Sequence, residues 1–266
     1  MPVGAVTYFP LNQIVCEDSL EVLKRFPMYS VDLVFTDPPY GIDDENKITF
    51  VGGLPLSNKD AWGETMNTPE DMQKFYKILA NLLDNILKED GSILLFFDRG
   101  KPFLLEPFYQ KFVFRNIIAF IKRNPSPHLN KNNYRSGFEL CAWFSRKKYK
   151  INFISQKDMV NVFYGTIGFS MFVGKHTTHP TEKYEWMVKP LIERHSDLGD
   201  IILDPFVGSG RICVEAKKLG RRYIGIDINE EYCEMARKWL DETVSIPPPK
   251  IKINKWFKGG DENGQL

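Results

Sequence analysis

The stretch IILDPFVGSGRICVEAKKLGRRYIGIDI, residues 201–228, contains the pattern that decides the fold. The apolar run that ends at Asp204 predicts a buried strand, and a glycine-rich turn follows it. Residues 211–220 are typical of a helix, and residues 222–228 predict a second strand. Strand, helix and strand in this order form a crossover unit of a parallel sheet.

The same alternation extends over most of the 266 residues and predicts an α/β protein with a doubly wound, mostly parallel, Rossmann-like sheet. Two segments, 115–123 and 139–148, are close enough in the chain to pair antiparallel, which puts an antiparallel strand at one edge. The other expected strands are 13–18, 92–98 and the run ending at Asp37. The expected helices are 19–27 with Ser19 as cap, 68–91 with Gly91 as stop, a broken helix at 101–111, 181–196 and 229–244.

Composition narrows the class of protein. A hydrophobic content of 43% is enough for a packed core, and a net charge of +1 means that any polyanion site is a local basic patch. The four cysteines lie far apart with no C-x-x-C pair, and no run of 18 apolar residues occurs. We therefore expect a soluble protein of a reducing compartment, without a disulfide framework. His176 and His179 have no cysteine or acid at ligand spacing, so no metal is expected.

The turn at Gly208, Ser209 and Gly210 has the composition of a ligand-binding turn. Glycine lets a backbone approach a ligand closely, and the helix that follows attracts negative groups. Asp227 stands 23 residues after Asp204, at the tip of the next strand, where an acid accepts hydrogen bonds from ribose hydroxyls. A nucleoside cofactor is the favoured interpretation, although Cys213 stands where a third glycine is expected. The alternative for Asp227 is a cap on the helix 229–244.

A second strand, in SVDLVFTDPPYGI at 30–42, ends on an acid, two prolines and an aromatic residue. Pro38 and Pro39 have no N–H, so this segment offers hydrogen-bond acceptors: the Asp37 carboxylate and the backbone carbonyls. Tyr40 adds a flat π face. This combination suits a flat ligand that carries an amino group, and the alternative is a plain structural turn.

Four motifs together resemble the S-adenosylmethionine-dependent amino-methyltransferases of DNA, over residues 13–240. They are EDSLEVL at 17–23, DPPY at 37–40, THPTEK at 178–183 and DPFVGSG at 204–210, and their order resembles that of the β group. The chain departs from the family at Tyr184, where proline is frequent, and at Arg211, where threonine is frequent. Arg211 could instead reach the cofactor carboxylate or a DNA phosphate.

The resemblance implies S-adenosylmethionine as cofactor. Within it, Asp18 accepts from the adenine amine, with a helix cap as its alternative role, and Phe206 packs on the cofactor, with a core position as its alternative. The cofactor-binding residues that the resemblance implies are Asp18, Thr181, Lys183, Asp204, Pro205, Phe206, Gly208, Ser209, Gly210, Asp227 and Asn229.

The implied catalytic residues are Asp37, Pro38, Pro39 and Tyr40. An exocyclic amine is a poor nucleophile, because its lone pair is delocalised into the ring. Acceptance of its two N–H groups by Asp37 and the Pro38 carbonyl frees the lone pair and stabilises the positive charge that develops. Tyr40 would stack on the base, which must be flipped out of the duplex.

Basic residues around two loops are candidates for phosphate contacts: Lys122, Arg123, Lys131, Arg135, Lys147 and Lys148. Residues 149–178 and a mobile loop at 41–66 are candidates for base recognition. The expected organisation is a catalytic half at 1–148, a small target-recognition insertion at 149–178, a cofactor-binding half at 179–245 and a basic, proline-broken tail at 246–266.

The chain is thus expected to be a site-specific DNA adenine-N6 methyltransferase acting on double-stranded DNA in the cytoplasm. Cytosine-N4 methylation is the nearest alternative, and the family tends to carry serine before the two prolines for that reaction. RNA methylation and a catalytically silent nucleic-acid-binding module are the others. A cognate restriction endonuclease is a conceivable partner, no membrane is involved, and a monomer or a homodimer both fit.

Overall fold

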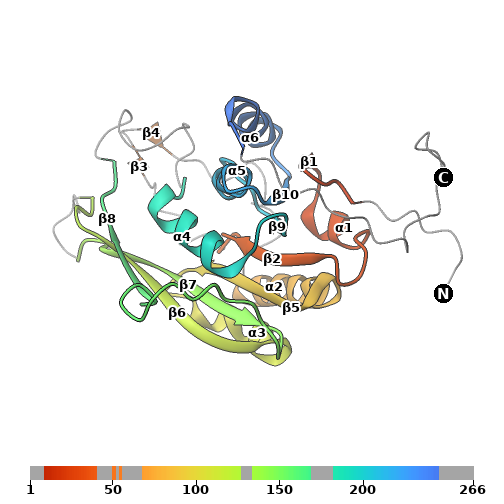
Figure 1. The fold of residues 1–266 in the computed structure, drawn as a ribbon, viewed down its shortest axis with the longest axis horizontal. Coiled ribbons are helices and arrows are strands. Elements are labelled where there is room, and N and C mark those ends of the chain that lie inside the picture. The colour runs from red at the N-terminus through yellow and green to blue at the C-terminus, as the bar shows by residue number, and fades with distance from the viewer. Residues whose placement is uncertain are drawn as a thin grey trace, which may run out of the picture.

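A sheet of eight strands runs through the centre of the computed structural model, which describes residues 9–40, 50–51, 54–55, 68–126, 134–168 and 182–245 (Figure 1). The strands are β1 (Gln13–Cys16), β2 (Val31–Thr36), β5 (Leu87–Phe97), β6 (Val113–Lys122), β7 (Phe138–Ser145), β8 (Val162–Gly165), β9 (Ile201–Asp204) and β10 (Arg222–Asp227). Their order is β1-β10-β9-β2-β5-β7-β6-β8. A separate antiparallel pair, β3 (Phe50–Val51) and β4 (Leu54–Pro55), falls within the segment 41–66.

Most neighbouring strands of the large sheet are parallel, which confirms the predicted fold class. β7 alone runs opposite to its neighbours β5 and β6. It lies third from the edge rather than at the edge, because β8 adds a further parallel strand beyond β6. The weak periodicity of residues 149–178 did not predict β8.

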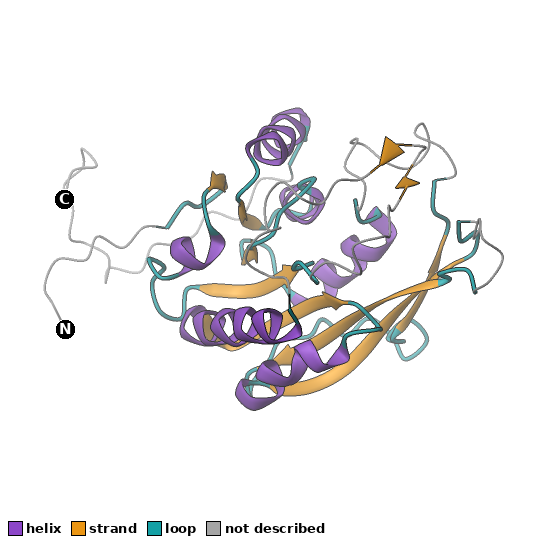
Figure 2. Ribbon diagram, turned by 180° about the vertical axis from the view of Figure 1, so that it is seen from behind, coloured by secondary structure: helices purple, strands orange, loops and turns teal. Residues whose placement is uncertain are grey.

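Helices cover both faces of the sheet (Figure 2). One face carries α1 (Ser19–Leu23), α2 (Pro69–Ile86), the 3₁₀ helix η1 (Pro102–Leu105) and α3 (Glu106–Lys111). The other carries α4 (Glu185–His195), α5 (Arg211–Lys218) and α6 (Glu230–Glu242). No helix in the described part of the chain is long and apolar enough to cross a membrane.

The strand β2 shows why a continuous apolar run occurs in this fold. All six of its residues are buried, with Leu33 and Phe35 in the core under α4–α6 and Val34 in the core under α1–α3. A strand covered on both faces needs apolar side chains at successive positions instead of alternating ones.

Two predicted boundaries are wrong. The helix α2, capped by Thr68, ends at Ile86 and not at Gly91, because Leu87 already pairs with Val31 of β2 and opens β5. Asp18, and not Ser19, is the N-cap of α1, since its Oδ1 accepts hydrogen bonds from the amides of Leu20 and Glu21.

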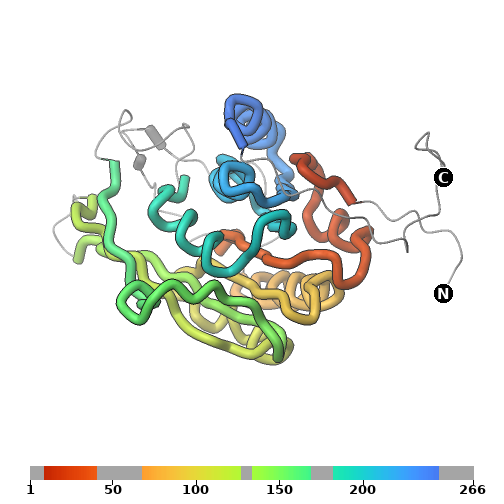
Figure 3. Tube along the Cα trace, in the orientation of Figure 1, coloured from red at the N-terminus to blue at the C-terminus, as the bar shows by residue number. Residues whose placement is uncertain are grey.

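The chain leaves β2 and β9 in opposite directions along the sheet, although the two strands are neighbours (Figure 3). From β2 it continues through α2 to β5, and from β9 it continues through α5 to β10. A reversal of this kind opens a crevice beyond the carboxyl ends of the two strands, where open α/β sheets bind their ligands. The Asp-Pro turns that begin at Asp37 and Asp204 both lie at the carboxyl ends of these two strands.

Candidate active site

A direct hydrogen bond joins the ends of β2 and β9. Thr36 Oγ1 donates to Asp204 Oδ1 at 2.8 Å, and the Phe206 amide donates to the same oxygen at 3.2 Å. Burial raises the pKa of Asp204 to about 7, and the nearby carboxylates of Asp37 and Asp227 contribute. The two predicted motifs therefore share one edge of the sheet.

Side chains from distant elements hold the turn at Asp37–Tyr40. The Tyr76 hydroxyl of α2 donates to the Pro39 carbonyl at 3.3 Å, and Lys101 Nζ donates to the Tyr40 carbonyl at 2.9 Å. The Tyr40 hydroxyl donates to Asp37 Oδ1. Sequence reasoning missed Tyr76, because it lies on the amphipathic face of α2 and its position is typical of a core residue. Among the residues that the structure describes, no group donates to the Pro38 carbonyl, so this acceptor is available.

Lys183, expected at the cofactor, lies against the catalytic motif. Its Nζ is 2.5 Å from Asp37 Oδ2 and 3.1 Å from Glu139 Oε2. Burial alone would lower the pKa of Lys183, but the two carboxylates outweigh burial and raise it above the usual range. The ammonium thus keeps its charge beside Asp37.

The carboxylate of Asp227 at the end of β10 holds the glycine turn after β9. Gly208 N donates to Asp227 Oδ2 at 2.9 Å, and Asn229 N donates to Asp227 Oδ1 at 3.0 Å. Gly210, at φ 91°, precedes α5, and a Cβ there would lie 2.9 Å from the Cβ of Ala236. Only glycine combines this backbone conformation with such close helix packing.

The cap of α6 is Asn229, whose side chain accepts from the Tyr232 amide at 3.2 Å. The alternative that Asp227 caps this helix is therefore wrong. Instead Asp227 orders the glycine turn, and burial raises its pKa. Two acids at adjacent strand ends, a glycine turn and a helix start form a set of groups that fits a nucleoside cofactor.

Residues near α1 complete this side of the crevice. Ser19 Oγ donates to the Pro205 carbonyl at 2.5 Å, which ties α1 to the turn after β9. Asp18 is the cap described above, so the alternative role foreseen for it is confirmed. The ring of Phe206 packs 5.7 Å from that of Phe75, measured between centroids.

The expectation that Arg211 reaches the cofactor carboxylate or a DNA phosphate is wrong. Its buried guanidinium pairs with Glu182 at 2.5 Å and with Glu215 at 3.1 Å, and it donates to the Lys183 carbonyl at 3.1 Å. It also lies over the ring of Trp239, 4.3 Å from its centroid. Arg211 therefore anchors the backbone of Lys183 to α5.

The structure separates the predicted phosphate-binding residues into groups. Lys122 Nζ pairs with Glu139 at 2.8 Å and is largely buried. Arg123 and Arg135 are exposed at the edge that carries Asp37, since Ile121 pairs with Phe138 there. Arg99, which the sequence did not single out, joins them through a 3.1 Å hydrogen bond to Ser136.

Lys147 and Lys148 are exposed at the opposite edge. They follow Ser145, which pairs with Ser92 at the middle of β5, whereas Leu140 pairs with Phe97 at the end of β5. At about 3.3 Å per residue the two lysines lie roughly 17 Å or more from the crevice edge. Thr181 and Lys131 lie outside the described residues, as do the tail 246–266, His176, His179 and most of 41–66.

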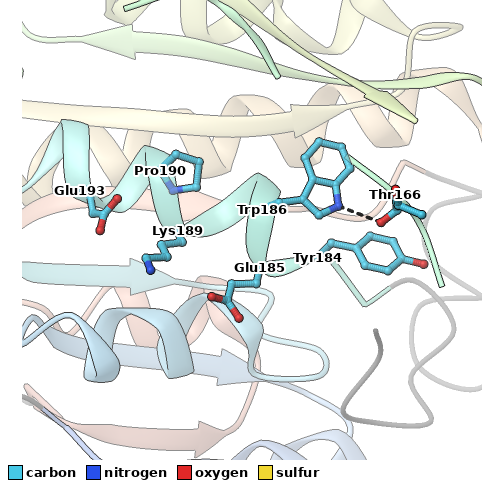
Figure 4. A pocket seen from close by; sticks show the side chains of 7 residues that line it. All are labelled: Thr166, Tyr184, Glu185, Trp186, Lys189, Pro190 and Glu193. Carbon is cyan, nitrogen blue, oxygen red and sulfur yellow. Dashed lines mark hydrogen bonds between the residues drawn. The ribbon is translucent and has the colours of Figure 1, made fainter. Parts of the chain in front are cut away.

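A cavity of about 480 Å³ lies beside α4, and one of its lining residues, Tyr184, directly follows Lys183 in the sequence (Figure 4). The rings of Tyr184 and Trp186 are stacked with centroids 6.5 Å apart, and Trp186 Nε1 donates to the Thr166 carbonyl at 3.2 Å. The residues that line the cavity are Thr166, Tyr184, Glu185, Trp186, Lys189, Pro190 and Glu193.

Residues 31–238 match the family model N6_N4_Mtase, described as DNA methylase. The chain is 30% identical over 251 residues to the Type II methyltransferase M2.DpnII of Streptococcus pneumoniae, covering 88% of this chain and 92% of that protein. It is 28% identical over 269 residues to the Type II methyltransferase M.HinfI of Haemophilus influenzae, covering 91% of this chain and 75% of that protein.

Solved structures share the fold. The M1.HpyAVI–SAM complex superposes with a TM-score of 0.66 at 24% identity, over 86% of this chain and 98% of that one. The PvuII DNA methyltransferase, described as cytosine-N4-specific, superposes with a TM-score of 0.67 at 19% identity, over 87% of each chain.

Proposed function

The chain belongs to the N6/N4 DNA methylase family, and from that membership we propose that it methylates the N6 amine of adenine at a specific site in double-stranded DNA. It is an S-adenosylmethionine-dependent DNA methyltransferase. We further propose which residues act on the base and which residues hold the DNA.

The observation that carries the proposal is the pair of acceptors at the end of β2. Asp37 lies near Asp204 at the strand ends, and Pro38 follows Asp37 in the chain. Asp37 and the Pro38 carbonyl could each accept one N–H of an amine. Fixed acceptors stabilise the positive charge that develops on the amine during transfer, without reorganisation. An acid before the two prolines favours adenine over cytosine by family resemblance. The hydroxyl of Tyr40, bonded to Asp37, orients the ring proposed to stack on the flipped base.

The cofactor is proposed to lie along the ends of β9 and β10. Asp227 would accept from the ribose hydroxyls and Asp18 from the adenine amine, and the Asp204–Gly210 turn would line the cofactor site with Phe206 packed on the cofactor. Thr181 and Asn229 complete the proposed set. When bound, S-adenosylmethionine supplies an electrophilic methyl group on a sulfonium centre.

DNA is proposed to approach the edge that carries Arg123 and Arg135, with Arg99 as a further contact. Phosphate contacts of this kind position the duplex, and residues 149–178 and 41–66 are proposed to read bases. The four-part organisation at 1–148, 149–178, 179–245 and 246–266 stays a proposal. So do a cognate restriction endonuclease, a monomeric or homodimeric state and a cytoplasmic location.

The direct test is transfer of labelled methyl groups to duplex DNA, followed by identification of the modified base. N6-methyladenine that appears in DNA and disappears with Asp37→Ala would support the proposal. If the product is N4-methylcytosine, the target base is cytosine and not adenine. If only RNA is labelled, the substrate is RNA and not DNA. If the protein binds DNA but transfers no methyl group, it is a catalytically silent DNA-binding module.

A further inference from the structure

Four charged side chains form a continuous chain across the crevice edge. Asp37, after β2, contacts Lys183 at 2.5 Å, Lys183 contacts Glu139 of β7 at 3.1 Å, and Glu139 contacts Lys122 of β6 at 2.8 Å. Each side chain exposes between 14% and 26% of its surface. Lys183 spans the intervening strand β5 by lying over the ring of Phe96, with Nζ 4.7 Å from its centroid.

We infer that Glu139 is a positioning residue for methyl transfer, which holds Lys183 in place and balances its charge so that Asp37 remains an effective acceptor for the amine. This inference rests on the proposed role of Asp37. Glu139 contacts Lys183 and Lys122 and acts on the base only through Lys183.

The geometry leaves Asp37 able to accept an amine. A carboxylate offers about four lone-pair sites. Lys183 bonds Oδ2 and the Tyr40 hydroxyl bonds Oδ1, so each oxygen keeps a further site. The two contacts fix the carboxylate plane, and a substrate N–H can approach it without displacing either partner.

Charge balance explains the need for Glu139. The amine becomes positive as the methyl group is transferred, and an uncompensated ammonium beside Asp37 would oppose that charge. Glu139 offsets Lys183, and Lys122 in turn offsets Glu139, so that the four groups together carry no net charge. Burial would raise the pKa of Glu139, but the two lysines outweigh burial and lower it to about 2.

Removal of Glu139 should make transfer sensitive to alkaline pH. Lys183 would keep only Asp37 as an ion-pair partner while burial still disfavours its charge, so its pKa would fall. Besides its own members Asp37, Lys183, Glu139 and Lys122, the titratable groups that interact with this cluster are Tyr40, Tyr76, Cys141, Tyr184 and Asp204.

The experiment measures single-turnover methyl transfer to duplex DNA at saturating S-adenosylmethionine, from pH 6 to pH 10. Glu139→Gln should transfer roughly 10- to 100-fold more slowly, the loss typical of removing a residue that orients a catalytic group. Its rate should rise at alkaline pH, as Lys183 loses the charge that opposes the developing positive charge, and the wild type should show no such rise; cofactor affinity should stay unchanged. Glu139→Asp should recover part of the rate because it restores the charge. The matched control is Glu89→Gln, the same change at an exposed position near the start of β5.

Asp37→Ala in the same series separates the two proposals. If it transfers at the wild-type rate, the proposed function fails at its catalytic residue. If it is inactive while folded Glu139→Gln matches the wild type in rate and pH profile, the positioning role is overturned.

A double-variant cycle provides an independent test. Lys122→Gln should cause a smaller loss in the same direction, and Lys122→Gln with Glu139→Gln should be no slower than Glu139→Gln alone, since Lys122 acts only through Glu139. If the rate losses of the two single variants add up in the double variant, the inference that Lys122 acts through Glu139 is wrong.

Discussion

The turns after β2 and β9 begin with the same dipeptide, Asp-Pro, yet they are held in different ways. Long side chains from elsewhere, Lys183, Tyr76 and Lys101, support the first turn. Short polar side chains support the second: Asp204 and Asp227 accept from turn amides, Thr36 donates to Asp204, and Ser19 donates to the Pro205 carbonyl. The first turn therefore places its acid beside a lysine, whereas the second places its acid against amides and a hydroxyl.

The comparison shows that the surroundings of Asp37 and Asp204, and not the side chains themselves, determine the role of each acid. Asp37 is half-buried, and its carboxylate is paired with the ammonium of Lys183 at the edge where the substrate is proposed to bind. Asp204 is almost fully buried, and burial raises its pKa to about 7. Two identical side chains at neighbouring strand ends are thus suited to different chemistry.

The largest expected effect is at the first turn. Asp37→Ala should lower the single-turnover rate by about 10²–10³-fold, because it removes a fixed electrostatic contact to the developing charge. Cofactor affinity, measured by calorimetry, should stay the same. A wild-type rate would make the turn after β2 structural and abolish the contrast between the two turns.

The second turn should show the reverse pattern. Asp227→Ala removes the acceptor of the Gly208 and Asn229 amides and should weaken S-adenosylmethionine binding by about 1–3 kcal/mol. Transfer at saturating cofactor should change little. Calorimetry that finds full affinity in a folded variant would remove Asp227 from the cofactor site.

The acid of the second turn, Asp204, should also make the free energy of unfolding depend on pH. Since the folded-state pKa of Asp204 is raised to about 7, its contribution to stability is present below its unfolded pKa and is lost as pH rises towards 7. The loss should not exceed about 1.4 kcal/mol per pH unit. Asp204→Asn keeps an oxygen for Thr36 and should flatten this slope. Denaturant unfolding of both proteins between pH 4 and pH 7 measures the difference, and parallel curves would contradict it.

The smallest effects concern DNA binding at the two edges of the sheet. Arg123→Glu with Arg135→Glu should weaken DNA binding across all sequences and reduce the salt slope by about 0.9 for each phosphate that is no longer neutralised. Lys147→Glu with Lys148→Glu, at the pair predicted from the sequence to bind phosphate, should leave that slope nearly unchanged, because these lysines lie at the far edge. Fluorescence anisotropy at several salt concentrations measures both. Equal slopes for the two double variants would place DNA across both edges.

Much of the fold could be predicted from local patterns. Glycine and proline residues located the turns after β2 and β9, and burial on both faces accounts for the successive apolar residues Leu33, Val34 and Phe35 of β2. The end of α2 could not be predicted, since pairing between Leu87 and Val31 overrides the helical pattern that continues to Gly91. The weak strand β8 depends in the same way on its neighbour β6.

The sequence by itself determined the chemistry of the two turns, because fixed proline φ angles, missing N–H groups and left-handed glycines act within a few residues. Only the tertiary structure decided which charges meet. It paired Lys183 with Asp37 and Glu139, buried Arg211 between two glutamates and sent Lys147 and Lys148 to the opposite edge. The reason is strand order: pairs such as Lys183 and Glu139, far apart in the chain, meet only if the right strands are neighbours, and local periodicity carries no information about that order.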